Sequence, residues 1–172
     1  MRVINGKAAR RRSILNEENE AWVQRKRWEE ALHRFGHPFP ALLIDRVEML
    51  EREKEIKTVK WITANEIYLS GHFPGEPIMP GVLTLEGLIQ GALILLRESL
   101  DRGKICVFLQ KVGRLRFKRA VLPGERVDFL VSLIGKEIPL WKFKGKAQVG
   151  GEVAAEADLT FKVDVREVGF EL

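Results

Sequence analysis

The sequence has almost no cysteine: Cys106 is the only one among 172 residues. A single cysteine excludes an internal disulfide framework and a zinc site built from a cluster of cysteines. A chain of this length can bury enough apolar surface to fold without such cross-links. We therefore expect a protein of a reducing compartment, the cytoplasm.

Long apolar runs are also missing. The longest apolar-rich stretch, Val82 to Leu96, contains Glu86 and Gln90 and is too short for a transmembrane helix. The charged start of the sequence is not followed by an apolar run of the length that a secretory signal needs. We expect no membrane span.

Excess charge is absent from most of the chain. The net charge is +5, yet residues 1–28 contain eight basic and three acidic side chains, and the remainder contains 21 of each. The main part of the chain is therefore not basic, and nucleic acid is not an expected partner. We divide the chain into a basic extension, residues 1–36, in which residues 16–35 have the pattern of a helix, and a main domain, residues 37–172.

Two apolar patterns follow in the main domain. Pro80 and Gly81 open a helix that runs to about Leu100 and is apolar almost all round, so it must be buried on nearly all sides. Successive strands without intervening helices predict antiparallel pairing, and Gly150-Gly151 is typical of a hairpin turn. We predict an α+β fold in which one long central helix is wrapped by a curved antiparallel β-sheet. The predicted strands are residues 53–63, 105–121, 126–136, 138–149 and 152–164.

The loop before this helix and the first turns of the helix carry the groups that indicate chemistry. His72 lies in a stretch, residues 70–81, with three glycines and three prolines, and Glu86 lies inside the helix beside apolar residues. A carboxyl group there is costly to ionise, so we expect Glu86 to hold a proton near neutral pH while His72 acts as a base. The unpaired N–H of Gly81 at the helix start is a natural site for a carbonyl oxygen or an oxyanion.

Each of these groups has a simpler interpretation when it is taken alone. His72 could be a structural histidine of a loop, and Glu86 could be a core residue that bonds Gln90 one turn further on. The glycines and prolines could serve only the turns. Their occurrence together in one run favours a functional site.

The run GHFPGEPIMPGVLTLEGLIQG, residues 71–91, closely resembles the signature of the (3R)-hydroxyacyl-[acyl-carrier-protein] dehydratases of fatty-acid synthesis, which have the hotdog fold. The segments HPFPALLIDRV, from residue 37, and RFKRAVLPGE, residues 116–125, resemble two further parts of these enzymes. The enzymes usually have the pair His-Arg at the start of the first segment, where this sequence has His37-Pro38. The resemblance covers most of residues 37–164. It implies dehydration of a (3R)-hydroxyacyl group on the acyl carrier protein to the trans-2-enoyl group, in fatty-acid or related lipid or polyketide biosynthesis.

The resemblance also implies roles for individual residues. His72 matches the catalytic histidine, Glu86 matches the catalytic acid, and the backbone N–H of Gly81 matches the group that polarises the thioester carbonyl. Glutamate at position 86 favours plain dehydration, because the related dehydratase-isomerases have aspartate there. Both chemical steps are proton transfers, so no metal and no other cofactor is implied. The residues implied to bind the substrate are Phe73, Pro80, Val82, Gln90, Leu115 and Phe117.

Partners follow from the same resemblance. The active sites of the family form across a homodimer, with the histidine and the acid from different subunits, and three such dimers make a hexamer. No acidic residue occurs between Lys111 and Arg119, and the resemblance favours this segment as a docking site for the acidic acyl carrier protein over a merely solvated strand face. The basic residues of this docking site are Arg114, Arg116, Lys118 and Arg119.

Two other functions stay open at this point. A thioesterase of the same fold would hydrolyse the thioester instead of dehydrating the acyl chain. A non-catalytic acyl-binding regulator would contact nucleic acid through the basic extension, although the intact pair of His72 and Glu86 argues against it.

Overall fold

The computed structural model describes residues 41–100 and 105–165. The basic extension, its expected helix over residues 16–35 and the boundary expected after residue 36 lie outside these residues and stay predictions. In the described part of the chain, no helix is long and apolar enough to cross a membrane.

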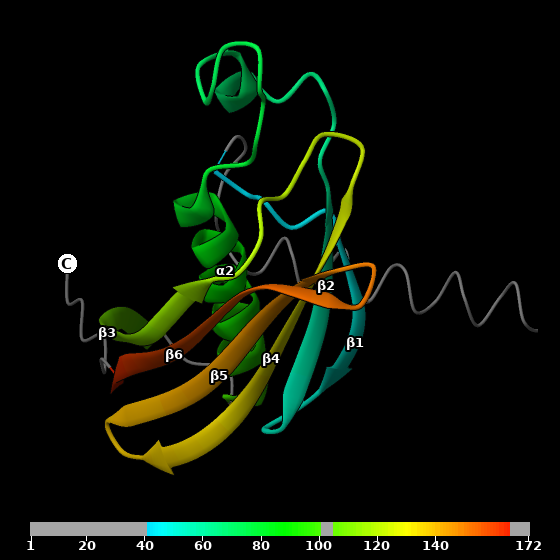
Figure 1. The fold of residues 1–172 in the computed structure, drawn as a ribbon. Helices are drawn as coiled ribbons and strands as arrows, with labels where there is room; N and C mark the ends of the chain where they lie inside the picture. Colours follow the sequence, from blue (N-terminus) through cyan, green and yellow to red (C-terminus); the bar gives the residue numbers. More distant parts are fainter. Residues whose placement is uncertain (1–40, 101–104, 166–172) are drawn as a thin grey trace, which may run out of the picture. The chain divides into compact units, whose positions relative to one another are not determined.

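Six strands form one sheet, and every neighbouring pair of strands is antiparallel. The strand order is β1-β2-β4-β5-β6-β3, so β1 and β3 are the edge strands. The long helix α2 and the short 3-10 helix η1 lie in the connection between β2 and β3 (Figure 1). The elements are β1 Arg46–Glu51, β2 Glu55–Trp61, η1 Ile67–Ser70, α2 Gly81–Ser99, β3 Ile105–Phe117, β4 Arg126–Glu137, β5 Leu140–Val149 and β6 Glu152–Val165.

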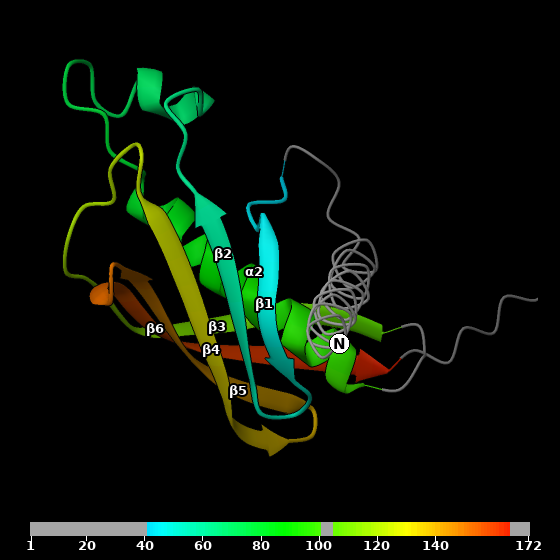
Figure 2. The same ribbon diagram turned by 90° about the vertical axis from the view of Figure 1, so that its right-hand side faces the viewer.

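The sheet curves around α2, as two views at right angles show (Figures 1 and 2). The helix contacts β2, β4, β5 and β6. Three phenylalanines on adjacent strands, Phe129, Phe143 and Phe161, are fully buried in the core between the helix and the sheet. The rings of Phe143 and Phe161 meet edge to face with their centroids 5.7 Å apart. The predicted α+β arrangement of one helix wrapped by an antiparallel sheet is confirmed.

Two glycines of α2 allow the helix to approach the sheet closely. A Cβ atom on Gly87 would lie 2.3 Å from Cζ of Phe129, and one on Gly91 would lie 3.3 Å from Cγ2 of Val131. These glycines are four residues apart and so lie on one face of the helix. The distance between α2 and β4 therefore depends on the absence of side chains at these two positions.

One flank of α2 is left partly open by residues 41–100 and 105–165. Val82 is exposed, while Glu86, Ile89 and Leu93 are only half-buried. We expected the helix to be covered on nearly all sides, but one sheet covers only the sides that face it. The edge strand β3 also exposes large apolar side chains, namely Phe108, Leu109, Leu115 and Phe117.

The turns agree with the sequence prediction except before the helix. Gly150 and Gly151 have φ angles of 58° and 88°, the positive values that a two-residue hairpin turn requires. The helix begins at Gly81 and ends at Ser99, one residue before the expected end. Ser70, expected in a loop, is instead the last residue of η1.

A network of ion pairs joins β1, β2 and β4 on the face of the sheet opposite α2. Glu48 accepts hydrogen bonds from Arg46 and Arg126 and lies 3.2 Å from Nζ of Lys57. Burial raises the pKa of Glu48, but the hydrogen bonds from Arg46, Lys57 and Arg126 outweigh it and lower the pKa to about 2. Because the pKa of the folded state lies below that of the unfolded state, the carboxylate of Glu48 stabilises the fold above about pH 4.5, and this contribution is lost as the pH falls toward 2.

Glu48→Gln is expected to lower the free energy of unfolding by about 1–2 kcal/mol at pH 7, after allowance for solvent screening, and by roughly half as much or less at pH 3. Urea unfolding of both proteins at the two pH values measures this difference. Glu51→Gln is the matched control, because Glu51 pairs with Lys54 where both side chains are more than half exposed. A deficit of Glu48→Gln that is equal at both pH values would contradict the assignment.

Candidate active site

The loop between η1 and α2 is held by its own backbone hydrogen bonds. Phe73 and Glu76 exchange two N–H to C=O bonds, both 3.1 Å long, and Ile78 N–H donates to the carbonyl of His72 at 2.9 Å. Met79 N–H donates to the carbonyl of Val121 at 2.8 Å, which ties the loop to the connection between β3 and β4. The loop thus presents His72 from an ordered backbone.

The imidazole of His72 is oriented by a backbone carbonyl. Its Nδ1 lies 3.1 Å from the carbonyl oxygen of Ile78. Because a carbonyl oxygen can only accept, Nδ1 must carry the hydrogen, and the lone pair of the neutral ring is on Nε2. The ring of Phe73 stacks on the imidazole with the centroids 4.2 Å apart. His72 is therefore set up to accept a proton at Nε2.

The start of α2 provides a free backbone donor. Pro80, the residue before the helix, has no N–H, and its carbonyl accepts from Leu83 at 2.9 Å and from Thr84 at 3.3 Å. Among the described residues, none accepts a hydrogen bond from the N–H of Gly81. The ring of Phe117 packs against Gly81, where a Cβ atom would lie 3.0–3.1 Å from three ring carbons. The Gly81 N–H is thus available at the positive end of a 19-residue helix.

Glu86 is held by Gln90, one turn further along α2. Nε2 of Gln90 donates to Oε1 of Glu86 at 2.9 Å and to the carbonyl of Ala41 at 2.8 Å. Oε1 of the fully buried Gln90 accepts from the N–H of Leu43 at 2.9 Å. The Leu43 donor fixes which end of the amide faces Glu86, so Oε1 of Glu86 is an acceptor and Oε2 is the oxygen that can carry a proton.

Within one chain, no hydrogen bond joins His72 to Glu86 among the residues that the structure describes. The two groups occupy consecutive segments, the loop and the second turn of α2. Glu86 is less enclosed than we expected, because Val82 on its face is 67% exposed. The sheet of the same chain does not cover this face.

Three of the four basic residues expected to bind the carrier are in ion pairs. Arg114 pairs with Asp158 at 2.8 Å, Lys118 with Glu156 at 3.0 Å, and Arg119 with Glu125 at 2.6 Å. In the described part of the chain, Arg116 is in no ion pair. Leu115 and Phe117, expected to line the acyl tunnel, are both partly exposed on the edge strand.

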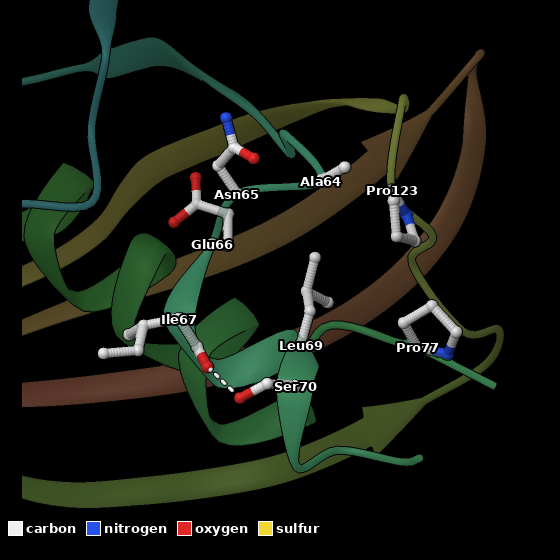
Figure 3. Close-up of a pocket in the computed structure, with 8 residues that line it drawn as sticks. All are labelled: Ala64, Asn65, Glu66, Ile67, Leu69, Ser70, Pro77 and Pro123. Carbon is white, nitrogen blue, oxygen red and sulfur yellow. Dashed lines mark hydrogen bonds between the residues drawn. The ribbon is translucent and has the colours of Figure 1, made fainter. Parts of the chain in front are cut away.

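A separate hollow of about 450 Å³ lies beside η1 (Figure 3). None of the predicted site residues lines it, and Ser70 beside it donates a 2.9 Å hydrogen bond to the carbonyl of Ile67. Across residues 41–100 and 105–165, no three His, Cys, Asp or Glu side chains are grouped as metal ligands. The residues around the hollow are Ala64, Asn65, Glu66, Ile67, Leu69, Ser70, Pro77 and Pro123.

Comparison with known families identifies the family to which the chain belongs. Residues 36–158 match the family model described as the FabA-like domain. The chain belongs to the FabA-like family. Its FabA-like domain contains the loop of His72, the whole of α2 and strands β1 to β5.

Named relatives of this FabA-like chain are dehydratases. It is 44% identical over 128 residues to a 3-hydroxyacyl-[acyl-carrier-protein] dehydratase FabZ of Verminephrobacter eiseniae, covering 72% of this chain and 84% of the relative. It is 43% identical over 128 residues to the dehydratase of the same name from Oceanobacillus iheyensis, covering 74% and 91%. The hot-dog-like protein of Thermanaerovibrio acidaminovorans, 17% identical, superposes with a TM-score of 0.58 over 69% of this chain and 86% of that one, which confirms the hotdog fold.

Proposed function

We propose that this protein is a 3-hydroxyacyl-[acyl-carrier-protein] dehydratase, a hydro-lyase that converts the (3R)-hydroxyacyl thioester to the trans-2-enoyl thioester and water in fatty-acid biosynthesis. The observation that carries this proposal is the identity of 43–44% to two named dehydratases over most of the chain. The local geometry of His72, Gly81 and Glu86 is suited to the two proton transfers that this reaction needs.

The proposed mechanism is an elimination across C2 and C3 of the acyl chain. Nε2 of His72 removes a proton from C2, and the Gly81 N–H stabilises the negative charge that develops on the thioester oxygen. The electron pair of the broken C–H bond forms the C2–C3 double bond as the C3–O bond breaks. Oε2 of Glu86 donates its proton to the departing hydroxyl group, which leaves as water. Proton exchange with solvent then restores neutral His72 and protonated Glu86.

We place this site at the interface of a homodimer, in which His72 of one subunit faces Glu86 of the other. The half-open flank of α2 around Val82 and the exposed apolar side chains of the edge strand β3 support this arrangement, because a second chain would bury both. Phe73, Pro80, Val82, Gln90, Leu115 and Phe117 would then surround the acyl chain. Three such dimers in a hexamer are part of the same proposal.

The acyl group is delivered by the acyl carrier protein, which docks on the basic residues at the end of β3. Arg114, Arg116, Lys118 and Arg119 support this part of the proposal through their positive charge. The single cysteine supports a cytoplasmic location.

The reverse reaction provides the test of this function. Incubation with the crotonyl thioester of N-acetylcysteamine is expected to consume the enoyl absorbance by addition of water, without release of free thiol. A thiol reagent in the same cuvette detects thioester cleavage, which is the reaction of the alternative thioesterase. Thiol release with no hydration of the double bond would refute the dehydratase and favour the thioesterase.

A further inference from the structure

The outer face of β5 carries a column of lysines that the proposed mechanism does not use. The column consists of Lys142, Lys144 and Lys146. The residues between and beside them in the strand are buried, namely Trp141, Phe143, Gly145 and Ala147. Because successive side chains of a strand point to opposite faces, the three lysines share the face that points away from α2. Lys144 and Lys146 are exposed there.

The strands on both sides of β5 leave this positive charge largely unbalanced. On the β4 side, Lys144 lies opposite Ser132 and Lys146 opposite Leu130, so no acid faces them. On the β6 side, Lys144 lies opposite Asp158 and Lys146 opposite Glu156. These are the only acids directly opposite the two lysines on β4 and β6, and both are in ion pairs with residues of β3 or its end, as described above.

The basic side chains around Glu156 and Asp158 that have no ion pair with a described residue are Arg116, Lys144 and Lys146. Glu156 on β6 has Lys146 of β5 as its register partner on one side and Arg116 of β3 on the other. The three basic residues therefore form one patch across β3, β6 and β5. The pKa of Glu156 is lowered by its hydrogen bond from Lys118 and by the charges of Lys118, Arg116 and Lys144, against a smaller opposing effect of burial. An acidic partner would gain from the same positive potential.

The patch is hollowed rather than flat. A depression of about 150 Å³ lies beside Lys146 and is lined by Arg114 and Arg116 of β3, by Lys144 of β5, and by Glu156, Ala157 and Asp158 of β6, whose two carboxylates are already in ion pairs with Lys118 and Arg114. A bulge in β3 between Gly113 and Arg116, with Arg114 at a φ of 40°, turns both arginines to this depression. A carboxylate-bearing helix could therefore meet arginine and lysine donors from two sides.

The patch lies beside the end of β3 that reaches the candidate active site. Arg116 immediately precedes Phe117, whose ring packs against Gly81 at the start of α2. A carrier held on this patch would hold its acyl thioester near the end of the sheet where the helix begins. A lysine of the same face that lies far from the patch is Lys162, in the register row of Leu140, six residues along β5 from Lys146, or about 20 Å away.

We propose that Arg116, Lys144 and Lys146 form the docking patch for the acidic surface of the acyl carrier protein. This inference rests on the proposed function, because it takes the carrier as the source of the substrate. It adds Lys144 and Lys146 of β5 to the docking site. The other expected docking residues have a secondary role, because they are already in ion pairs within the chain: Arg114 with Asp158, Lys118 with Glu156 and Arg119 with Glu125.

The test compares the same acyl group as a thioester of the carrier protein and as a thioester of a small thiol. For the double variant Lys144→Glu/Lys146→Glu, kcat/KM with crotonyl-acyl carrier protein is expected to fall by about tenfold and to become less sensitive to salt. Hydration of the crotonyl thioester of N-acetylcysteamine, which has no carrier to dock, should stay within about twofold of wild type. Lys162→Glu is the control, with the same substitution made once on the same face, and should leave both substrates unaffected.

Each outcome separates docking from chemistry. An unchanged kcat/KM with the carrier substrate, or an equal loss in Lys162→Glu, overturns the docking patch and leaves the dehydratase standing. If the wild-type protein hydrates neither the carrier-bound crotonyl group nor the N-acetylcysteamine thioester, the proposed function is overturned instead. In that case, fluorescence anisotropy of labelled carrier protein with the wild-type and double-variant chains still tests the patch, and equal affinities would overturn it.

Discussion

Replacement of His72 by alanine, or of Glu86 by glutamine, is expected to lower kcat for hydration of the crotonyl thioester by about 10³-fold or more. General bases and acids that act in the transition state contribute effects of this size. His72→Ala removes Nε2, the proposed base. Glu86→Gln retains an oxygen that can accept the hydrogen bond from Gln90 but removes the acidic proton, so the loss reports the chemistry rather than the position of the side chain.

Glu76→Gln is the matched control for both variants. Glu76 lies in the same loop as His72 and its side chain is exposed, while the bonds that shape the loop involve only its backbone. We expect its activity to stay within about twofold of wild type, as is usual for a surface substitution. Activity of Glu86→Gln close to that of wild type would show that the proton for the leaving hydroxyl comes from another group.

The two inactive variants also test whether the site is shared between subunits. In a homodimer that combines His72 of one chain with Glu86 of the other, a heterodimer of His72→Ala and Glu86→Gln contains one intact site and one doubly defective site. Unfolding and refolding an equal mixture should then restore about a quarter of the wild-type activity. If each chain formed its own site, the mixture would stay inactive.

The part of this fold that could be predicted from the sequence is the part with local signals. The apolar run after Pro80 predicted α2 to within one residue of its end, and Gly150-Gly151 predicted the β5–β6 turn. The candidate site also has local signals: a histidine within the glycine- and proline-rich GHFPG motif, and the carboxyl group of Glu86 inside an apolar helix. Patterns of this kind depend on neighbours along the chain, which a sequence displays directly.

The partners of the site residues could not be predicted, because they are backbone groups distant in sequence. Gln90 bonds Ala41 and Leu43, nearly fifty positions away, and a peptide N–H or C=O has no side-chain signature. The bulge that turns Arg114 toward the basic depression was missed as well, since arginine is not a residue that favours positive φ. Only the register of β3 on β6 reveals it.

The spacing of the helix glycines contained a signal that was not used. Gly87 and Gly91 are four residues apart inside an otherwise apolar helix, although glycine weakens a helix by about 1 kcal/mol relative to alanine. Such a pair indicates a face that another element approaches closely. The structure identifies that element as β4, through Phe129 and Val131.

Gly87→Ala is therefore expected to destabilise the protein by about 2–3 kcal/mol and to lower Tm by roughly 4–10 °C at a fixed protein concentration. The new Cβ would lie 2.3–2.7 Å from three carbons of the Phe129 ring, which is fully buried and has no flexible end to move aside. The better helix propensity of alanine offsets only about 1 kcal/mol of this cost. Gly91→Ala is the control, because its closest contact, at 3.3 Å from a methyl of Val131, needs a shift of only a few tenths of an ångström.

A double variant identifies the clash as the cause. Phe129→Leu alone should destabilise by about 1–2 kcal/mol through the volume it removes from the core. Combined with Gly87→Ala, the smaller side chain leaves room for the new Cβ, so the double variant should lose at least about 1 kcal/mol less than the sum of the two single losses. Urea unfolding of all four proteins measures this coupling. Strictly additive losses would mean that Gly87 matters for the backbone of α2 itself, and that the approach of the helix to β4 is not what requires a glycine at this position.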